Sequence, residues 1–243
     1  MRRSLRYILP GLTFMILGSV VVAQPGASPA GHWEGTIQAA NQAVEFSADL
    51  AKTPAGVWIG SLSIPMANAI GLPLTDISVQ DNAVHFAIAE FPGKPSFEGR
   101  LSADANELTG NSVSPNGAVP FKLQRKGEAN VKLPTPSTAM SADFEGTWNG
   151  TIDAGQAVLR VVVKLSRAAD GSAAGSMISV DQGGQEIPMS TVTIQAKQLQ
   201  FEMRAVGGAF RGTLGANGEI VGTFTQGPAS LPVALKRASV EAK

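Results

Sequence analysis

The feature that most constrains this chain is a long internal repeat. Residues 31–37 read Gly-His-Trp-Glu-Gly-Thr-Ile, and residues 146–152 read Gly-Thr-Trp-Asn-Gly-Thr-Ile, 115 positions later. The same offset aligns Phe86 with Phe201 and Pro73 with Pro188. A repeat of this length is a duplicated domain rather than a unit of a solenoid. The sequence therefore predicts two domains of one design, at residues 31–126 and 144–238.

The N-terminus is typical of an export signal, predicted at residues 1–23. Three arginines precede a mainly apolar stretch at residues 7–22, and Val-Val-Ala at residues 21–23 is a small-residue cleavage pattern, so cleavage is expected before Gln24. An uncleaved anchor is the alternative, because the apolar stretch is nearly long enough to cross a bilayer. The chain contains no cysteine, which excludes a lipid-modified cysteine and disulfides. A periplasmic or secreted bacterial protein is expected.

Charge argues against some classes of partner. Removing Arg2, Arg3 and Arg6 with the signal leaves 16 basic and 19 acidic residues, a net charge of about −3. The remaining lysines and arginines form no basic stripe. We therefore expect no nucleic-acid partner, and no membrane association beyond the export signal.

Apolar and polar residues alternate with a period of two throughout both repeats, as in half-buried strands. Turn pairs such as Asp170-Gly171 and Asn217-Gly218 separate the runs. In the second repeat the predicted strands lie at residues 147–153, 158–166, 172–179, 189–195, 198–205, 208–214, 219–225 and 231–237.

Short connections favour sequential antiparallel pairing, and closing eight strands into a barrel removes exposed edges. The predicted fold is all-β, with two tandem small eight-stranded antiparallel meander barrels, similar to lipocalin and avidin barrels. The polar, proline-interrupted stretch at 127–143 is predicted to be an extended linker. Residues 24–30 are predicted to form a short disordered leader.

Strand phase suggests an aromatic plug in each repeat. Trp33 and Trp148 lie in the first strands, and Arg125 and Arg237 share a face with apolar residues in the last strands. The first and last strands of a closed meander are neighbours, so each arginine is expected to stack on its tryptophan and contribute about 0.5–2 kcal/mol. The alternative is that the tryptophans line a ligand pocket. Trp58 has no aromatic counterpart and is either a surface aromatic or a contact unique to the first barrel.

One segment of the second repeat suggests a family. Residues 181–183 read Asp-Gln-Gly and are followed by Ile-Pro at residues 187–188, within a domain that begins with Gly-Thr-Trp and ends with Leu-Pro-Val-Ala-Leu-Lys-Arg. This combination resembles the all-β module that precedes the catalytic domain in some bacterial secreted α/β-hydrolases and β-lactamase-related serine hydrolases. The resemblance covers residues 146–237. The first repeat has Met-Ala-Asn-Ala-Ile-Gly at residues 66–71 in place of this segment, so the two repeats differ most at 66–72 and 181–187.

The residues of a catalytic centre are missing from the sequence. It has no Gly-x-Ser-x-Gly elbow, and no Ser-x-x-Lys with partner motifs. His32 and His85 are too few for a usual zinc cluster and fall on the polar phase of their strands, which predicts surface histidines. Asp181 and Glu186 could be a carboxylate pair, but a glycine-rich hairpin favours a role in the turn. We expect no enzymatic activity, no cofactor and no bound metal.

Two binding functions remain open. In the first, the protein is an interaction module whose loops at residues 181–187 and 66–72 bind another envelope protein, such as a separately encoded hydrolase. In the second, it carries a small apolar ligand inside a barrel, as lipocalins do. The candidate ligand or partner contacts across both versions are Asp181, Gln182, Gly183, Glu186, Trp148, Phe201 and Met203. Short repeats favour the interaction module, because small barrels usually fill with their own side chains.

Overall fold

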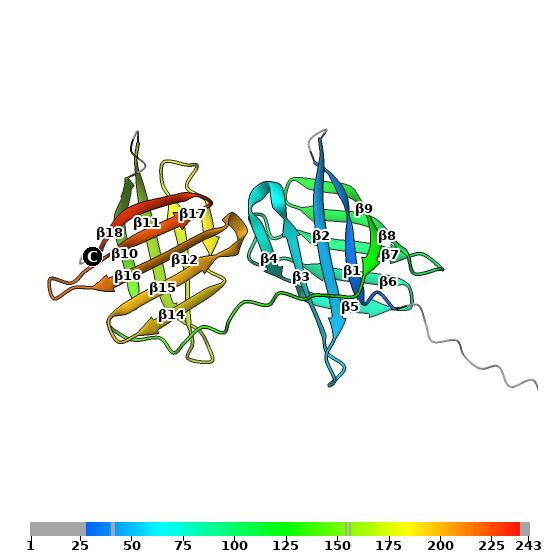
Figure 1. Ribbon diagram of the computed structural model, residues 1–243, viewed down its shortest axis with the longest axis horizontal. Coiled ribbons are helices and arrows are strands. Elements are labelled where there is room, and N and C mark those ends of the chain that lie inside the picture. The colour runs from blue at the N-terminus through cyan, green and yellow to red at the C-terminus, as the bar shows by residue number, and fades with distance from the viewer. Residues whose placement is uncertain (1–27, 40–41, 154, 156, 239–243) are drawn as a thin grey trace, which may run out of the picture.

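The computed structural model describes residues 28–39, 42–153, 155 and 157–238. The predicted export signal lies outside these residues. The described chain forms 18 strands in two antiparallel sheets of nine, with two short 3-10 turns, η1 (Pro65–Ala67) and η2 (Arg204–Val206). Figure 1 shows two separate barrels side by side along the long axis of the molecule. The predicted all-β fold of two tandem barrels is confirmed.

The strands of each barrel follow one another in chain order. The first barrel contains β1 (Gly31–Ala39), β2 (Gln42–Lys52), β3 (Trp58–Ile64), β4 (Ala69–Pro73), β5 (Thr75–Gln80), β6 (Ala83–Ala87), β7 (Ser96–Leu101), β8 (Glu107–Ser114) and β9 (Gly117–Gly127). The second contains β10 (Gly146–Asp153), β11 (Val158–Arg167), β12 (Ala173–Ser179), β13 (Glu186–Pro188), β14 (Thr191–Gln195), β15 (Gln198–Met203), β16 (Gly208–Leu214), β17 (Glu219–Gln226) and β18 (Ala229–Arg237).

In both barrels the first strand pairs with the last, as the sequence predicted. The strand order is β4-β3-β2-β1-β9-β8-β7-β6-β5 in one and β13-β12-β11-β10-β18-β17-β16-β15-β14 in the other. The tryptophan and arginine are direct cross-strand partners, Trp33 with Arg125 and Trp148 with Arg237. This register is what brings the two predicted plug residues together.

Each barrel has nine strands rather than the predicted eight. The additional strands are β4 and β13, which lie in segments that the sequence predicts to be loops. Only Leu74 separates β4 from β5, and Met189 and Ser190 separate β13 from β14. The N–H of Leu74 donates to the carbonyl of Gly60 in β3, and that of Met189 donates to Gly175 in β12. The two ends of each sheet therefore meet at a sharp bend beside β3 or β12.

The interior of each barrel is filled by apolar side chains. In the first barrel the rings of Phe86 and Phe97 stack with centroids 4.8 Å apart, and Phe121 meets Phe97 edge-on at 5.5 Å. In the second barrel Phe201 and Phe210 stack at 5.0 Å. These rings and their aliphatic neighbours form one continuous core per barrel.

The linker at residues 127–143 is extended, but it is not a free spacer. Along the first barrel, the N–H of Asn130 donates to the Asp49 carboxylate and that of Lys132 to the Ser61 hydroxyl. Along the second, the N–H of Thr138 donates to the carbonyl of Val192 in β14. Figure 1 shows this green segment crossing the first barrel in front of β1, β2 and β3 and continuing along the second. Both barrels are therefore tied to the segment between them.

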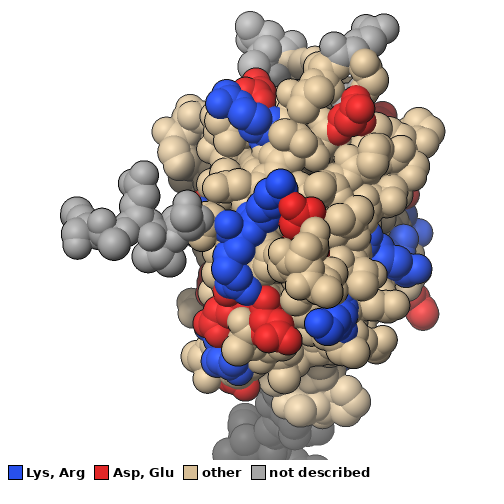
Figure 2. Space-filling model, turned by 90° about the vertical axis from the view of Figure 1, so that its left-hand side faces the viewer, with Lys and Arg blue, Asp and Glu red and all other residues tan. Residues whose placement is uncertain are grey.

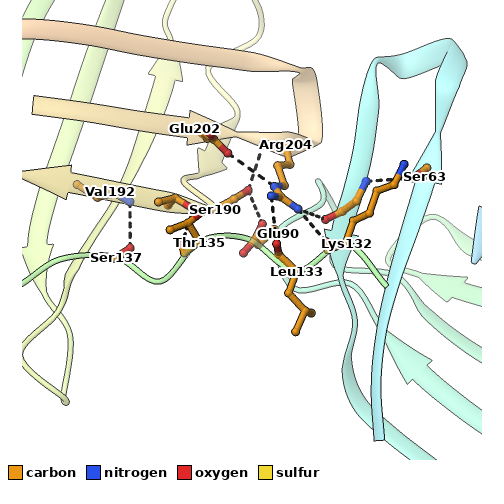
Figure 3. A network of polar contacts seen from close by, with 12 residues as sticks. Ser63, Glu90, Lys132, Leu133, Thr135, Ser137, Ser190, Val192, Glu202 and Arg204 are labelled. Atoms are coloured by element: carbon orange, nitrogen blue, oxygen red, sulfur yellow. Dashed lines mark hydrogen bonds and ion pairs between the residues drawn. The ribbon is translucent and has the colours of Figure 1, made fainter. Parts of the chain in front are cut away.

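The two barrels meet through Arg204 and its neighbours. The guanidinium of Arg204 in η2 donates to the carbonyls of Gly71 and Lys132, both at 2.8 Å. The hydroxyl of Ser190 donates to the Glu90 carboxylate of the first barrel at 2.5 Å. These contacts lie where η2 faces β4 (Figure 3).

The contact between the barrels is also apolar. Ala205 belongs to the second barrel but is buried in the core of the first, and Ile187 packs against both cores. A methyl group added at Gly207 would lie 2.7 Å from the carbonyl of Asn68. The 66–72 loop, for which the sequence suggests partner binding, contacts the second barrel through Asn68 and Gly71.

Candidate functional site

The plug of each barrel is built from one tryptophan, one arginine and the chain that precedes the first strand. The Arg125 Cζ lies 4.5 Å from the Trp33 ring centroid, and the Arg237 Cζ lies 4.4 Å from that of Trp148. Each indole N–H donates to a backbone carbonyl, that of Pro29 or Phe144. Both tryptophans are at most 1% exposed. The geometry is that of a sealed barrel end.

The residues before β1 are part of this plug. The Arg125 guanidinium donates to the carbonyls of Ser28 and Ala30, in the place where Arg237 uses those of Asp143 and Glu145. The sequence predicted a disordered leader at residues 24–30, and for residues 28–30 this is wrong. The arginine holds them because a partly buried guanidinium needs acceptors for its N–H groups.

Three predicted ligand contacts lie in the core instead of in a binding pocket. Trp148, Phe201 and Met203 are 1%, 2% and 0% exposed, and all three belong to the apolar core of the second barrel. An apolar side chain fills the space that a carried ligand would need. The structure therefore brings these residues together, but as packing.

The other predicted contacts lie on the outer surface of the second barrel. Asp181 accepts the backbone N–H of Arg160 at 2.7 Å and pairs with its guanidinium at 2.6 Å. These hydrogen bonds from the Arg160 side chain and backbone lower the pKa of Asp181. Gln182 and Gly183 complete the same turn, in which the Ser179 hydroxyl donates to the Gln182 side-chain oxygen and Gly183 adopts a φ of 88°. Asp181, Gln182 and Gly183 therefore form an ordered turn with a charged side chain, which we call the Asp181 corner.

Glu186 forms a second charged group on the same face. It accepts hydrogen bonds from the Ser176 hydroxyl and the Lys164 ammonium, and both lower its pKa. The Lys164 Nζ lies 2.9 Å from the carboxylate. Asp181 and Glu186 are thus paired with separate cations of β11 and do not form a joint carboxylate pair. The sequence reading that favoured a turn role over catalysis fits this arrangement.

Between these two ion pairs lies a line of apolar side chains. Val162 in β11 is the direct cross-strand neighbour of Ile178 in β12, and Val180 follows at the end of β12 with 40% of its surface exposed. We call Val162, Ile178 and Val180 the β11–β12 strip. A depression of about 520 Å³ adjoins it, lined by Val162 and Val180 together with Thr151, Ala234 and others.

The first barrel has a corresponding depression of different chemistry. Its volume is about 460 Å³, and its lining includes Glu34, Glu45, Ser47 and Pro65. The repeat offset places Ser47 opposite Val162 and Pro65 opposite Val180. The same part of the scaffold therefore carries two glutamates and a serine in the first copy, where the second has asparagine, arginine and valine, and each lining also includes a lysine.

The two histidines occupy different surroundings. His32 bridges two carboxylates, with Nδ1 2.9 Å from Asp49 and Nε2 3.2 Å from Glu34. Burial lowers the pKa of His32, but the hydrogen bonds and charges of Asp49 and Glu34 outweigh it, so the pKa is raised. His85 lines a shallow outer depression over β5–β8. Over the described ranges, no group of three or more possible ligands is placed to hold a metal ion.

Surface charge is mixed. Figure 2 shows blue and red side chains interspersed with large uncharged areas on the end of the second barrel that faces away from the first. In the part of the chain that the structure describes, no helix is long and apolar enough to cross a membrane.

Sequence reasoning missed the β11–β12 strip and the arginine between the barrels. The strip had a signal, since Val158, Val162 and Ile178 fall on the outward phase of strands whose inward phase is also apolar. Arg204 had none, because its partners are backbone carbonyls more than 70 residues away in the chain.

Comparisons with known proteins assign no family. No protein-family model matches the chain, and no curated protein does. Among solved structures, a candidate outer membrane protein from Bacteroides fragilis is 12% identical, with a TM-score of 0.27 over 85% of this chain and 95% of that one. A protein of unknown function from the DUF3598 family of Nostoc punctiforme is 11% identical, with a TM-score of 0.24 over 86% and 96%. At these TM-scores neither likeness extends the assignment of function.

Proposed function

We propose that this chain is an exported, non-enzymatic protein of the bacterial envelope that binds another protein through the outer face of its second barrel. The observation that supports this most is the contrast between the filled interior and the β11–β12 strip. Apolar side chains occupy the inside of the barrel, while apolar side chains on the outside lie between two ion pairs. Exposed apolar surface rimmed by polar groups is typical of an interaction site.

The Asp181 corner is the second element of the proposed site. Its charge is fixed by Arg160, and Gly183 and Gly184 extend beyond it with no atom within 4 Å of where a side chain would start. A turn of this kind presents backbone and carboxylate groups to a partner without depending on the core. A separately encoded secreted hydrolase is the partner class that the sequence resemblance suggests.

Replacing Asp181 and Gln182 together by alanine tests the proposal. We expect capture of the envelope partner from a periplasmic extract to fall at least about tenfold, with the thermal melt unchanged, because exposed ion pairs contribute little stability. The matched control is Gln195→Ala with Gln198→Ala, two exposed residues of another hairpin in the same barrel. Equal capture by both variants, or a collapsed melt in the first, would argue that the corner is structural.

The lipocalin-like carrier is the weaker alternative. It requires a cavity in a barrel, and the interior positions that would line one are the packed residues Trp148, Phe201 and Met203. Native mass spectrometry of the exported protein distinguishes the two functions. A bound lipid-like mass that is lost on unfolding would support the carrier and contradict the interaction module.

A further inference from the structure

The first barrel shows how this scaffold holds a polypeptide on its outer face. Asp49 in β2 and Ser61 in β3 point outward, yet they are only 8% and 2% exposed. The linker covers them, and its backbone N–H groups at Asn130 and Lys132 donate to their side-chain oxygens. An extended chain thus lies across neighbouring strands without joining the sheet.

In the second barrel, the positions equivalent to Asp49 and Ser61 are not available to hold a polypeptide, and the neighbouring cross-strand pair of residues is apolar. The repeat offset places Lys164 opposite Asp49, and Ser176 opposite Ser61. Both are bonded to Glu186, so the acceptors that hold the linker in the first barrel have no counterpart available here. The neighbouring row carries serine at 47 and 63 in the first barrel, but Val162 and Ile178 in the second.

We infer that the β11–β12 strip binds an extended, uncharged segment of a partner polypeptide. This inference rests on the proposed interaction function and names the partner's binding element. The strip spans two strands, about 5 Å apart, so an extended segment of a few residues with alternate side chains facing the sheet matches its width. The adjoining depression of about 520 Å³, whose lining also includes Arg160 and Lys236, has room for a larger side chain of the segment.

The charges around the strip explain why the segment is uncharged. Arg160 is paired with Asp181 at one end of the strip. Lys164 is paired with Glu186, which is the direct cross-strand neighbour of Ile178 in β13. Each carboxylate already has a cation within 3 Å. A charged side chain on the segment would have to displace one of these pairs, whereas apolar side chains use the surface between them.

The test is a selection of nine-residue peptides displayed on phage against the exported chain. The comparison variant is Val162→Ser with Ile178→Ser, which puts the first barrel's residues at these positions and is therefore compatible with the fold. We expect enriched peptides to carry apolar residues at alternate positions. Their synthetic forms should bind the double-serine variant at least about tenfold more weakly.

The control variant is Val221→Thr, which changes an outward residue of β17 that is 57% exposed, and it should bind the peptides as the parent does. The protein lacks cysteine, so Val158→Cys provides a single site for a fluorophore that reports peptide binding beside the strip. Peptides that bind the double-serine variant as tightly as the parent, or a selection without enrichment over that variant, would overturn the inference.

The same peptides separate this inference from the proposed function. One outcome is that peptide binding depends on Val162 and Ile178 while partner capture survives Asp181→Ala with Gln182→Ala. This result would support the β11–β12 strip as the binding site and reject the Asp181 corner. If partner capture depends on the Asp181 corner but peptide binding does not depend on the β11–β12 strip, the inference is rejected and the proposed function stands.

Discussion

The segment after the third strand, residues 66–72 in the first barrel and 181–187 in the second, has different contacts in the two barrels. In the first, β4 and the turn before it lie against η2 of the second barrel, and Gly71 receives a hydrogen bond from Arg204. In the second, the equivalent corner holds Asp181 against Arg160 and stays at the surface. One copy forms an interface inside the molecule, and the other remains at the surface. After the duplication, the segment that follows the third strand could therefore differ between the two barrels.

The largest expected effect tests whether the two plugs are equivalent. Trp148→Ala should destabilise the second barrel by about 3–5 kcal/mol, because it removes a fully buried ring and leaves the Arg237 guanidinium without its stacking surface. Trp33→Ala should do the same to the first barrel. Calorimetry of both variants checks this. A small loss of unfolding free energy in only one of the two variants would show that one plug is dispensable and that the two plugs are not equivalent.

The next effect concerns the contact between the barrels. Arg204→Ala removes the donor to the carbonyls of Gly71 and Lys132 and should cost about 1–3 kcal/mol of coupling between the barrels. We expect the parent to melt in one transition and Arg204→Ala to melt in two. Arg211→Ala, an exposed arginine of the same barrel, is the control and should leave the melt as it is. An unchanged transition for Arg204→Ala would mean that the apolar contacts at Ala205 and Ile187 suffice.

A smaller effect sharpens the comparison of the two outer faces. Asp49→Ala should destabilise the first barrel by about 1–3 kcal/mol, because the Asn130 N–H and His32 lose a buried acceptor. Glu186→Ala, in the neighbouring part of the second barrel, should scarcely change the melt, because its ion pair is exposed. Hydrogen exchange at Asn130 gives a local readout. If it stays protected in Asp49→Ala, the linker is held by other contacts.

The smallest effect is a pH dependence confined to the first barrel. The folded pKa of His32 is raised above its usual 6.5 by Asp49 and Glu34, despite burial. Its stabilising contribution is therefore complete below about pH 6.5 and is lost as the pH rises through the raised folded pKa. Thermal melts between pH 5 and 9 should show this slope in the parent and a weaker one in His32→Gln. The second barrel has Thr147 at this position and supplies the comparison within the same molecule.

Much of the fold could be predicted from sequence, because the patterns that determine it are local. Alternation predicts most strands within a few residues, and strand phase predicts that Arg125 lies over Trp33. β13 escaped because three residues are too few to show alternation, and the bend at Met189 makes sense only in the closed sheet. The repeat itself carried the architecture, since the two copies agree where the core and plug require it.

The candidate site was predictable only in part. The contrast between residues 66–72 and 181–187 identified a segment at which the two barrels differ, and Asp181 and Glu186 lie on one outer face. Phe201 and Met203 were assigned to ligand contact because alternation shows that a side chain faces inward but not whether space remains beside it. In the contact between the barrels, Arg204 bonds to backbone carbonyls, whose positions no residue type reveals.

The chain before β1 sets a boundary for processing of the N-terminus. Arg125 and Trp33 hold the carbonyls of Ser28, Pro29 and Ala30, and these residues follow the expected cleavage position before Gln24 by only a few positions. A signal peptidase can cut upstream of Ser28 and leave the barrel end sealed. A cut a few residues further along would remove the acceptors and expose the indole, so the stability of the first barrel would depend on where the predicted signal is cleaved.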